Sequence, residues 1–117
     1  MRLEDLVGAL LRYDALAARQ WVADARREGL EWRTVPEPRS LDPVGMAVAA
    51  GIVELLASRA RQSPPDWTAA VPALPEPLLL VRAAAWMPRL RHVCEVEGPA
   101  PLRKRGLLAP PEFLTAA

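Results

Sequence analysis

The chain has 117 residues, a formal net charge of +1, 51% apolar residues and 25% charged residues. This length corresponds to one domain, and the composition is typical of a globular protein rather than a disordered one. The near-zero net charge excludes a global electrostatic attraction to nucleic acid or membrane surfaces, and a single cysteine, Cys94, excludes an internal disulfide.

The first part of the chain is predicted to be helical, because apolar residues recur at intervals of three and four from Leu3 to Ala25. Asp14 interrupts this pattern, and its carboxylate can cap a following helix by accepting from free backbone amides. We therefore expect either one helix with a fault near Tyr13 or two helices that meet there. Gly29 predicts the end of this helical region.

Residues 30–41 are predicted to form a connector, because Pro36 and Pro38 prevent a regular helix. Asp42 and Pro43 then suit the N-cap and the first position of a new helix. Its stripe of small apolar residues, which includes Gly51, would allow another helix to approach closely. This helix should end before Pro64.

The second half of the chain is divided by prolines, since ten of the thirteen lie at or after residue 64. A short helical turn is predicted from Asp66. A helix is predicted over residues 78–87 and another over residues 88–97, with Pro88 separating them because proline disrupts a helix interior. Single turns are expected after Pro101 and Pro111, and no strand pair is evident.

The C-terminal stretch VEGPAPLRKRGLLAPPEFL (residues 96–114) alternates turn-forming residues with apolar ones. We predict that the turns return the apolar side chains to the helical core. These side chains are Leu102, Leu107, Leu108, Phe113 and Leu114. The basic residues 103–105 would then project between two apolar clusters.

Together these elements predict an all-α fold: a compact bundle of about four main helices with proline-rich connectors and a C-terminal tail of short turns packed on the core. We expect one domain over residues 1–117, with N-terminal helices in 1–62 and a proline-punctuated half in 63–117. The early acidic residues argue against a secretory signal, and the longest apolar run, residues 46–53, is too short to cross a membrane. We therefore expect a cytoplasmic protein.

The sequence offers no catalytic constellation. His92 and Cys94 are the only residues of their types, and at positions i and i+2 of a helix their side chains point apart. This is too few ligands for zinc and the wrong geometry for a nucleophile pair. Glycine-rich phosphate loops and serine-hydrolase motifs are absent as well. We expect no enzymatic activity, no metal and no cofactor.

Positive charge is concentrated in residues 82–117, which hold six basic and three acidic groups. The six are Arg82, Arg89, Arg91, Arg103, Lys104 and Arg105. They are candidates for contacts with nucleic-acid phosphates. The ordinary alternative is a solvated basic turn near a helix C-terminus.

The four tryptophans divide into two pairs. Trp21 and Trp86 follow the helical apolar spacing and are predicted to belong to the core. Trp32 and Trp67 lie in proline-flanked segments and, with Arg103, Lys104 and Arg105, are our candidates for contacts with a protein partner, because Trp and Arg are enriched at interaction hot spots.

The stretch from Glu95 to Leu114, with PLRKRG followed by PPEFL, resembles a C-terminal signature of small bacterial proteins, some of which are linked to toxin–antitoxin loci. Pro65-Asp66-Trp67-Thr68 and residues 78–81 are similar too. The resemblance implies a cytosolic accessory or regulatory protein that works by contact. We therefore expect a non-enzymatic protein-interaction module, antitoxin-like or accessory in a toxin–antitoxin-type pair, whose partner is another protein or a second copy. The alternative is a DNA-binding transcriptional regulator that uses the basic C-terminal third.

Overall fold

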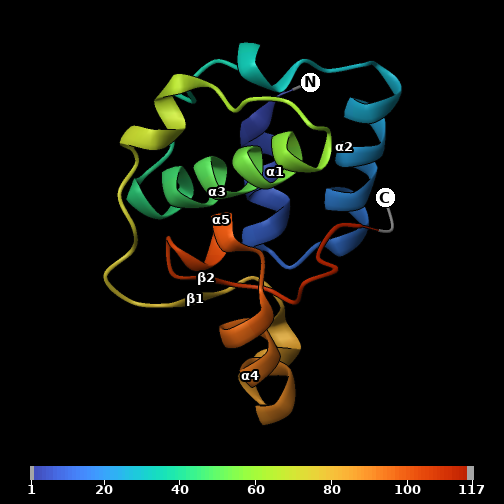
Figure 1. Cartoon of the computed structure of the whole chain (residues 1–117). Coiled ribbons are helices and arrows are strands. Elements are labelled where there is room, and N and C mark those ends of the chain that lie inside the picture. The colour runs from blue at the N-terminus through green and yellow to red at the C-terminus, as the bar shows by residue number, and fades with distance from the viewer. Residues whose placement is uncertain (1, 116–117) are drawn as a thin grey trace.

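The computed structural model describes residues 2–115. Three of the four longer helices in this range pack together as a small bundle, and the fourth lies on a projecting lobe (Figure 1). The α-helices are α1 (Leu3–Leu11), α2 (Ala15–Arg27), α3 (Pro43–Arg59), α4 (Pro88–Glu97) and α5 (Ala100–Arg103). Two strands, β1 (Leu78–Leu79) and β2 (Leu107–Leu108), form a small parallel sheet. Three short 3₁₀ helices, η1 (Trp32–Thr34), η2 (Asp66–Ala70) and η3 (Arg82–Ala85), complete the secondary structure of these residues. The all-α class is thereby confirmed.

The N-terminal region consists of two helices rather than one. Tyr13 adopts a left-handed backbone (φ 59°) after α1, and the carboxylate of Asp14 accepts a hydrogen bond from the Ala17 amide at 3.0 Å. The Asp14 amide in turn donates to the carbonyl of Ala9, which satisfies an acceptor at the end of α1. The cap that was expected at Asp14 is therefore confirmed. α2 ends near Gly29, whose φ of 68° is a left-handed value that favours glycine.

Helix α3 runs through the centre of the bundle, where it contacts α1, α5, η1 and η2. Asp42 caps it by accepting from the Gly45 amide at 2.7 Å. Residues 47–57 are all buried, as expected for a helix that is apolar around its whole circumference. A Cβ atom on Gly51 would lie 2.8 Å from a methyl group of Leu107, so the missing side chain lets the C-terminal segment approach α3 closely. The predicted close approach is confirmed.

The helix predicted over residues 78–87 is wrong. Leu78 and Leu79 instead pair in parallel with Leu107 and Leu108, and the chain then makes the short helix η3. The Leu78 amide donates to the Gly106 carbonyl at 2.8 Å, so the backbone is satisfied by a segment distant in sequence. Periodicity alone does not distinguish a strand from a helix in a short apolar run bounded by prolines. Here the pairing with residues 107–108 decides for the strand.

The C-terminal residues pack against the bundle as predicted. We call residues 99–114 the C-terminal belt. Its leucines at 102, 107, 108 and 114 are buried, and Phe113 is half-buried against the main core. Arg59 of α3 donates to the carbonyl oxygens of Phe113 and Pro111, which ties the last turn to the end of that helix.

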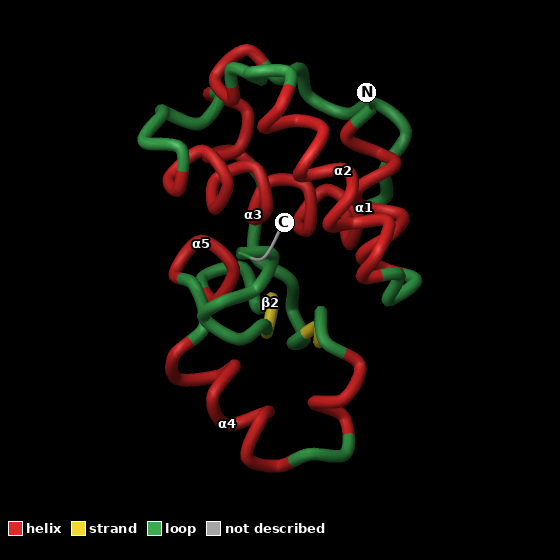
Figure 2. The backbone as a smooth tube through the Cα atoms, turned by 90° about the vertical axis from the view of Figure 1, so that its right-hand side faces the viewer, coloured by secondary structure: helices red, strands yellow, loops and turns green. Residues whose placement is uncertain are grey.

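Residues 82–98 form a lobe that extends away from α1, α2 and α3 (Figures 1 and 2). We call this lobe the arm. It contains η3, the link 86–87 and α4, and Ala84 and Cys94 bury a small apolar cluster together with Leu108 of the belt. A Cβ atom on Gly98 would lie 2.5 Å from the Cys94 carbonyl oxygen and 2.6 Å from that of Ala109. Glycine is therefore required where the arm meets the belt.

Candidate functional site

The basic turn at residues 103–105 is tied to the core by a buried ion pair. Arg105 is only 3% exposed, and its guanidinium binds Glu54 of α3 through two hydrogen bonds of 2.6 and 3.0 Å. The same guanidinium donates to the Thr68 carbonyl oxygen at 2.6 Å. Arg105 therefore connects the belt, α3 and η2, and it leaves no charged surface for a partner or a phosphate.

Glu54 lies at the centre of this network and is 9% exposed. Burial by itself would raise the pKa of its carboxyl group, but hydrogen bonds from Arg105 and Lys104 outweigh the burial and hold the pKa below its ordinary value. Glu54 is therefore ionised at neutral pH, as its counterion requires. The Lys104 ammonium lies 2.9 Å from the same carboxylate, but its side chain is 58% exposed.

The three basic residues of this turn thus have different environments. Arg103 and Lys104 are exposed, whereas Arg105 is buried. Arg103 donates to the Val96 carbonyl at 3.0 Å, which links the belt to the last turn of α4. The expectation that all three side chains project into solvent is wrong for Arg105, because Glu54 supplies a buried counterion.

The arm carries the other three basic residues and an exposed aromatic side chain. Arg82, Arg89 and Arg91 are all exposed, and Arg91 lies 3.5 Å from Glu95 on the same helix. Trp86 is 65% exposed and Met87 is 47% exposed. Both belong to the link between η3 and α4, at the end of the arm farthest from the bundle (Figure 2).

The predicted placement of the tryptophans is partly reversed. Trp86 was expected in the core and is exposed, because residues 78–87 do not form the helix that would have turned it inward. Trp32 was a candidate partner contact and is 6% exposed. Trp67 is half-buried and donates to the Val35 carbonyl at 2.8 Å, whereas Trp21 packs against the core with its ring 6.3 Å from that of Trp32, as expected.

Cys94 and His92 both lie on α4, where Cys94 is buried and His92 is exposed. Cys94 is buried, and burial together with the negative charge of Glu112 raises the pKa of its thiol. A thiol in such surroundings is a weak nucleophile. Within residues 2–115, no group of three or more His, Cys, Asp and Glu side chains is arranged to hold a metal ion. No helix of this range combines the length and apolar character needed to cross a bilayer.

Two notable residues of the structure, the buried Glu54 and the exposed Met87, were not predicted from the sequence. Glu54 is the only charged side chain between Pro43 and Ser58, and that isolated charge in an apolar helix was a usable signal for a buried pair. Its partner Arg105 is 51 positions away, which no local pattern reveals. Met87 gave no comparable signal, because it was assigned to a helix that does not form.

Comparisons with protein-family models, with curated proteins and with solved structures found no match to this chain. The resemblance of residues 95–114 to bacterial toxin–antitoxin-linked proteins therefore stays a prediction.

Proposed function

We propose that this protein is a non-enzymatic interaction module that contacts a protein partner through the arm tip, which we define as Trp86, Met87 and Arg89. The observation that carries the proposal is the exposure of Trp86, 65%, beside a Met87 that is 47% exposed. Trp, Met and Arg are the residue types enriched at protein interfaces. Here all three lie within four positions at the end of a projecting lobe.

A contact at this place would remove apolar surface from water. If a partner covered the exposed part of Trp86, about 160 Å² would leave water, which corresponds to about 4 kcal/mol before the costs of association. The tip is also held in position, because the amides of Trp86 and Met87 both donate to the Ala83 carbonyl and Pro88 begins α4. Little backbone conformational entropy would therefore be lost when this surface is covered.

Our proposal for the class of partner rests on the resemblance of residues 95–114 to the C-terminal signature of toxin–antitoxin-linked proteins. Within this proposal, the partner is a component of a toxin–antitoxin-type pair in the bacterial cytoplasm, and this chain has an antitoxin-like or accessory role. A second copy of the chain is the other arrangement that the proposal allows.

A comparison of Trp86→Ala with Leu16→Ala tests the proposal. Leu16 is 77% exposed on α2, so its variant is matched in exposure but lies outside the arm. Each variant would be used to capture proteins from the native host, and the affinity of a captured partner would then be measured with purified proteins. Self-association would be followed by analytical ultracentrifugation.

We expect Trp86→Ala to weaken partner binding at least about 30-fold, as for a hot-spot truncation, while Leu16→Ala binds like the wild type. Both variants should melt like the wild type, because neither side chain is buried. Equal binding by Trp86→Ala and the wild type, or no partner and no self-association, would refute the proposal.

A second candidate function is nucleic-acid binding by the same arm. It is favoured by three exposed guanidinium groups, Arg82, Arg89 and Arg91, on a lobe whose tip presents a tryptophan on which a base can stack. Mobility shifts with neighbouring promoter DNA and with single strands, measured across a salt series, test it. Phosphate contacts require a shift that weakens steeply with salt, and the absence of a shift at low salt removes this candidate.

A further inference from the structure

The segment that leads from η2 toward the arm runs along the outer edge of the molecule (Figure 1). We call residues 71–77, VPALPEP, the proline strap. Its three prolines, Pro72, Pro75 and Pro77, are all exposed, and so is Glu76. Aromatic side chains recognise proline-rich extended segments, because proline lacks an amide donor and restricts the backbone before binding. The proline strap therefore presents a surface that suits an aromatic partner.

The C-terminal belt holds the proline strap in place. The Leu74 amide donates to the Arg105 carbonyl at 3.0 Å, and the Leu78 amide donates to the Gly106 carbonyl at 2.8 Å. The Leu74 side chain also packs against the main core. Because the backbone of the proline strap is fixed before a partner arrives, little of its conformational entropy would be lost on binding.

The proline strap and the arm carry opposite charges. Residues 62–81 contain no lysine or arginine, whereas residues 77–94 contain no aspartate or glutamate. The first stretch carries two exposed carboxylates, Asp66 and Glu76, and the second carries the three exposed arginines of the arm. The segment around the proline strap is therefore acidic, and the arm is basic from its root through the tip and along α4 until Glu95.

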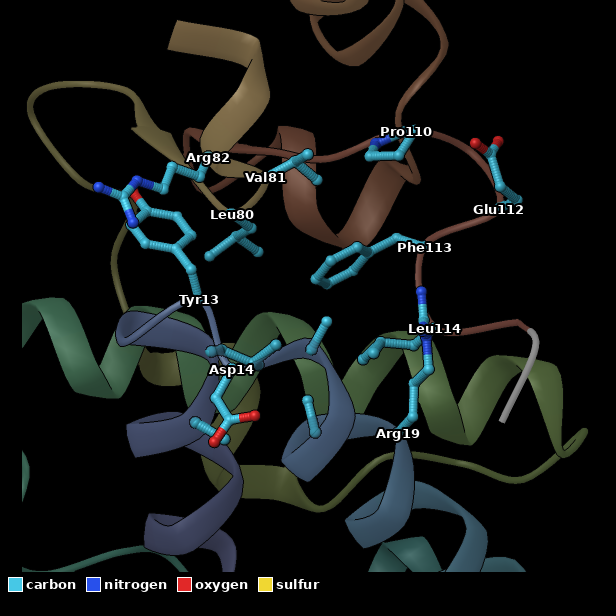
Figure 3. Close-up of a pocket in the computed structure, with 14 residues that line it drawn as sticks. Tyr13, Asp14, Arg19, Leu80, Val81, Arg82, Pro110, Glu112, Phe113 and Leu114 are labelled. Atoms are coloured by element: carbon cyan, nitrogen blue, oxygen red, sulfur yellow. The ribbon is translucent and has the colours of Figure 1, made fainter.

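These opposite charges do not pair within one chain. Among residues 2–115, no ion pair is formed by the two carboxylates or by two of the three arginines, Arg82 and Arg89. Figure 3 shows the Arg82 side chain apart from both acidic side chains that the view labels, Asp14 and Glu112. The arm tip lies at the end of the lobe farthest from the bundle (Figure 2). The complementary charges are therefore available to a second molecule.

From this combination we infer that the arm tip of one copy binds the proline strap of a second copy. The inference rests on the proposed function, because it names the second of the two partners that the function allows for the arm tip. The ring of Trp86 would lie against the exposed prolines, and the guanidinium groups of the arm would face Glu76. One chain thus carries both halves of the contact, and two copies related by a two-fold axis would make it twice.

Analytical ultracentrifugation of the purified whole chain tests the inference. We expect the wild type to pass from monomer to dimer as its concentration rises to about 1 mM, the range of weak contacts. Glu76→Arg should weaken this association about tenfold, because it places a positive charge against the arm. The matched control Glu31→Arg makes the same change at an exposed carboxylate outside the proline strap and should associate like the wild type. Added salt should also weaken association, since exposed charges are screened.

A mixture of two variants tests whether the arm tip and the proline strap meet each other. Trp86→Ala keeps the proline strap and loses the anchor of the tip, whereas Glu76→Arg keeps the tip and loses the charge of the proline strap. Each variant alone should remain largely monomeric. An equimolar mixture should form more dimer than either variant alone, because each supplies the half that the other lacks. A contact between two arm tips would give no such recovery.

Three results would overturn the inference: a wild type that stays monomeric at every concentration, a Glu76→Arg variant that associates like the wild type, or a mixture that associates no better than its components. A monomeric wild type that still captures a host protein through Trp86 overturns this inference and leaves the proposed function standing. The substituted side chains are all exposed, so thermal melts should not change. If Glu76→Arg alters the melt, Pro75→Ala replaces it as the strap variant.

Discussion

Replacing Glu54 by glutamine should destabilise the protein by about 3 kcal/mol, because it leaves the Arg105 charge buried without a counterion. Arg105 is 3% exposed, and two of its hydrogen bonds, at 2.6 and 3.0 Å, end on the Glu54 carboxylate. Breaking a buried pair by removing one partner costs about 3–5 kcal/mol. The lower end applies here, since the glutamine amide oxygen can still accept one bond and the Thr68 carbonyl remains in place.

The loss would be a large part of the total, because domains of this size are stable by roughly 5–15 kcal/mol. It corresponds to a fall of about 12 °C in melting temperature. Urea unfolding measures the change in free energy and thermal melts measure the melting temperature, each followed by tryptophan fluorescence and circular dichroism. Lys104→Ala is the matched control: its ammonium also pairs with Glu54, but the side chain is 58% exposed, so the expected loss is at most about 1 kcal/mol.

A double variant separates the ion pair from simple packing. In Glu54→Leu/Arg105→Met both charges are removed together, and apolar replacement of a buried pair is often close to neutral. We expect it to be more stable than Glu54→Gln. A buried pair of this strength is refuted if Glu54→Gln unfolds at the same urea concentration as Lys104→Ala, or if the double variant is less stable than Glu54→Gln.

Three further predictions concern pH, the belt and the arm. Folding lowers the pKa of Glu54 from an ordinary value of 4.5, so the unfolded state binds more protons in acid. The free energy of unfolding should therefore fall as the pH drops below that value. In acid titrations of stability, Glu54→Gln should show a flatter dependence on pH than the wild type. Phe113→Ala should cost about 1–2 kcal/mol because its ring is half-buried against the core, and thermal melts equal to the wild type would contradict the packed belt. Gly98→Ala should cost at least about 2 kcal/mol, since its methyl group would overlap the Cys94 and Ala109 carbonyl oxygens, and unchanged urea unfolding would show that the arm is not packed as described.

The helices of the first half could be predicted because their signals are local. Asp14 and Asp42 accept from amides three positions later, so each cap depends on residues within one helical turn. The apolar spacing of α1 and α2 likewise repeats over neighbouring turns. The turns of the belt followed from its prolines and from Gly106, whose φ of 79° suits glycine.

The segment that leads into the arm could not be predicted in the same way. Leu78 of β1 pairs with Leu107 of β2, so β1 exists only because the belt lies beside it. Because residues 78–79 form a strand, residues 78–87 do not have the helical spacing that predicted a core position for Trp86. Trp86, which was predicted in the core, is exposed, and Trp32, which was predicted to contact a partner, is buried.

Composition and local pattern determined the all-α class, the helices α1 to α4, the caps at Asp14 and Asp42, and the inward return of the belt leucines. The tertiary structure decided which segments meet: Glu54 with Arg105, Leu78 with Leu107, and the α1–α2 junction with Phe113. The physical reason is the range of the interactions. Caps, turns and helical periodicity involve residues a few positions apart, whereas ion pairs, strand pairs and cavities depend on segments that only the folded chain brings together.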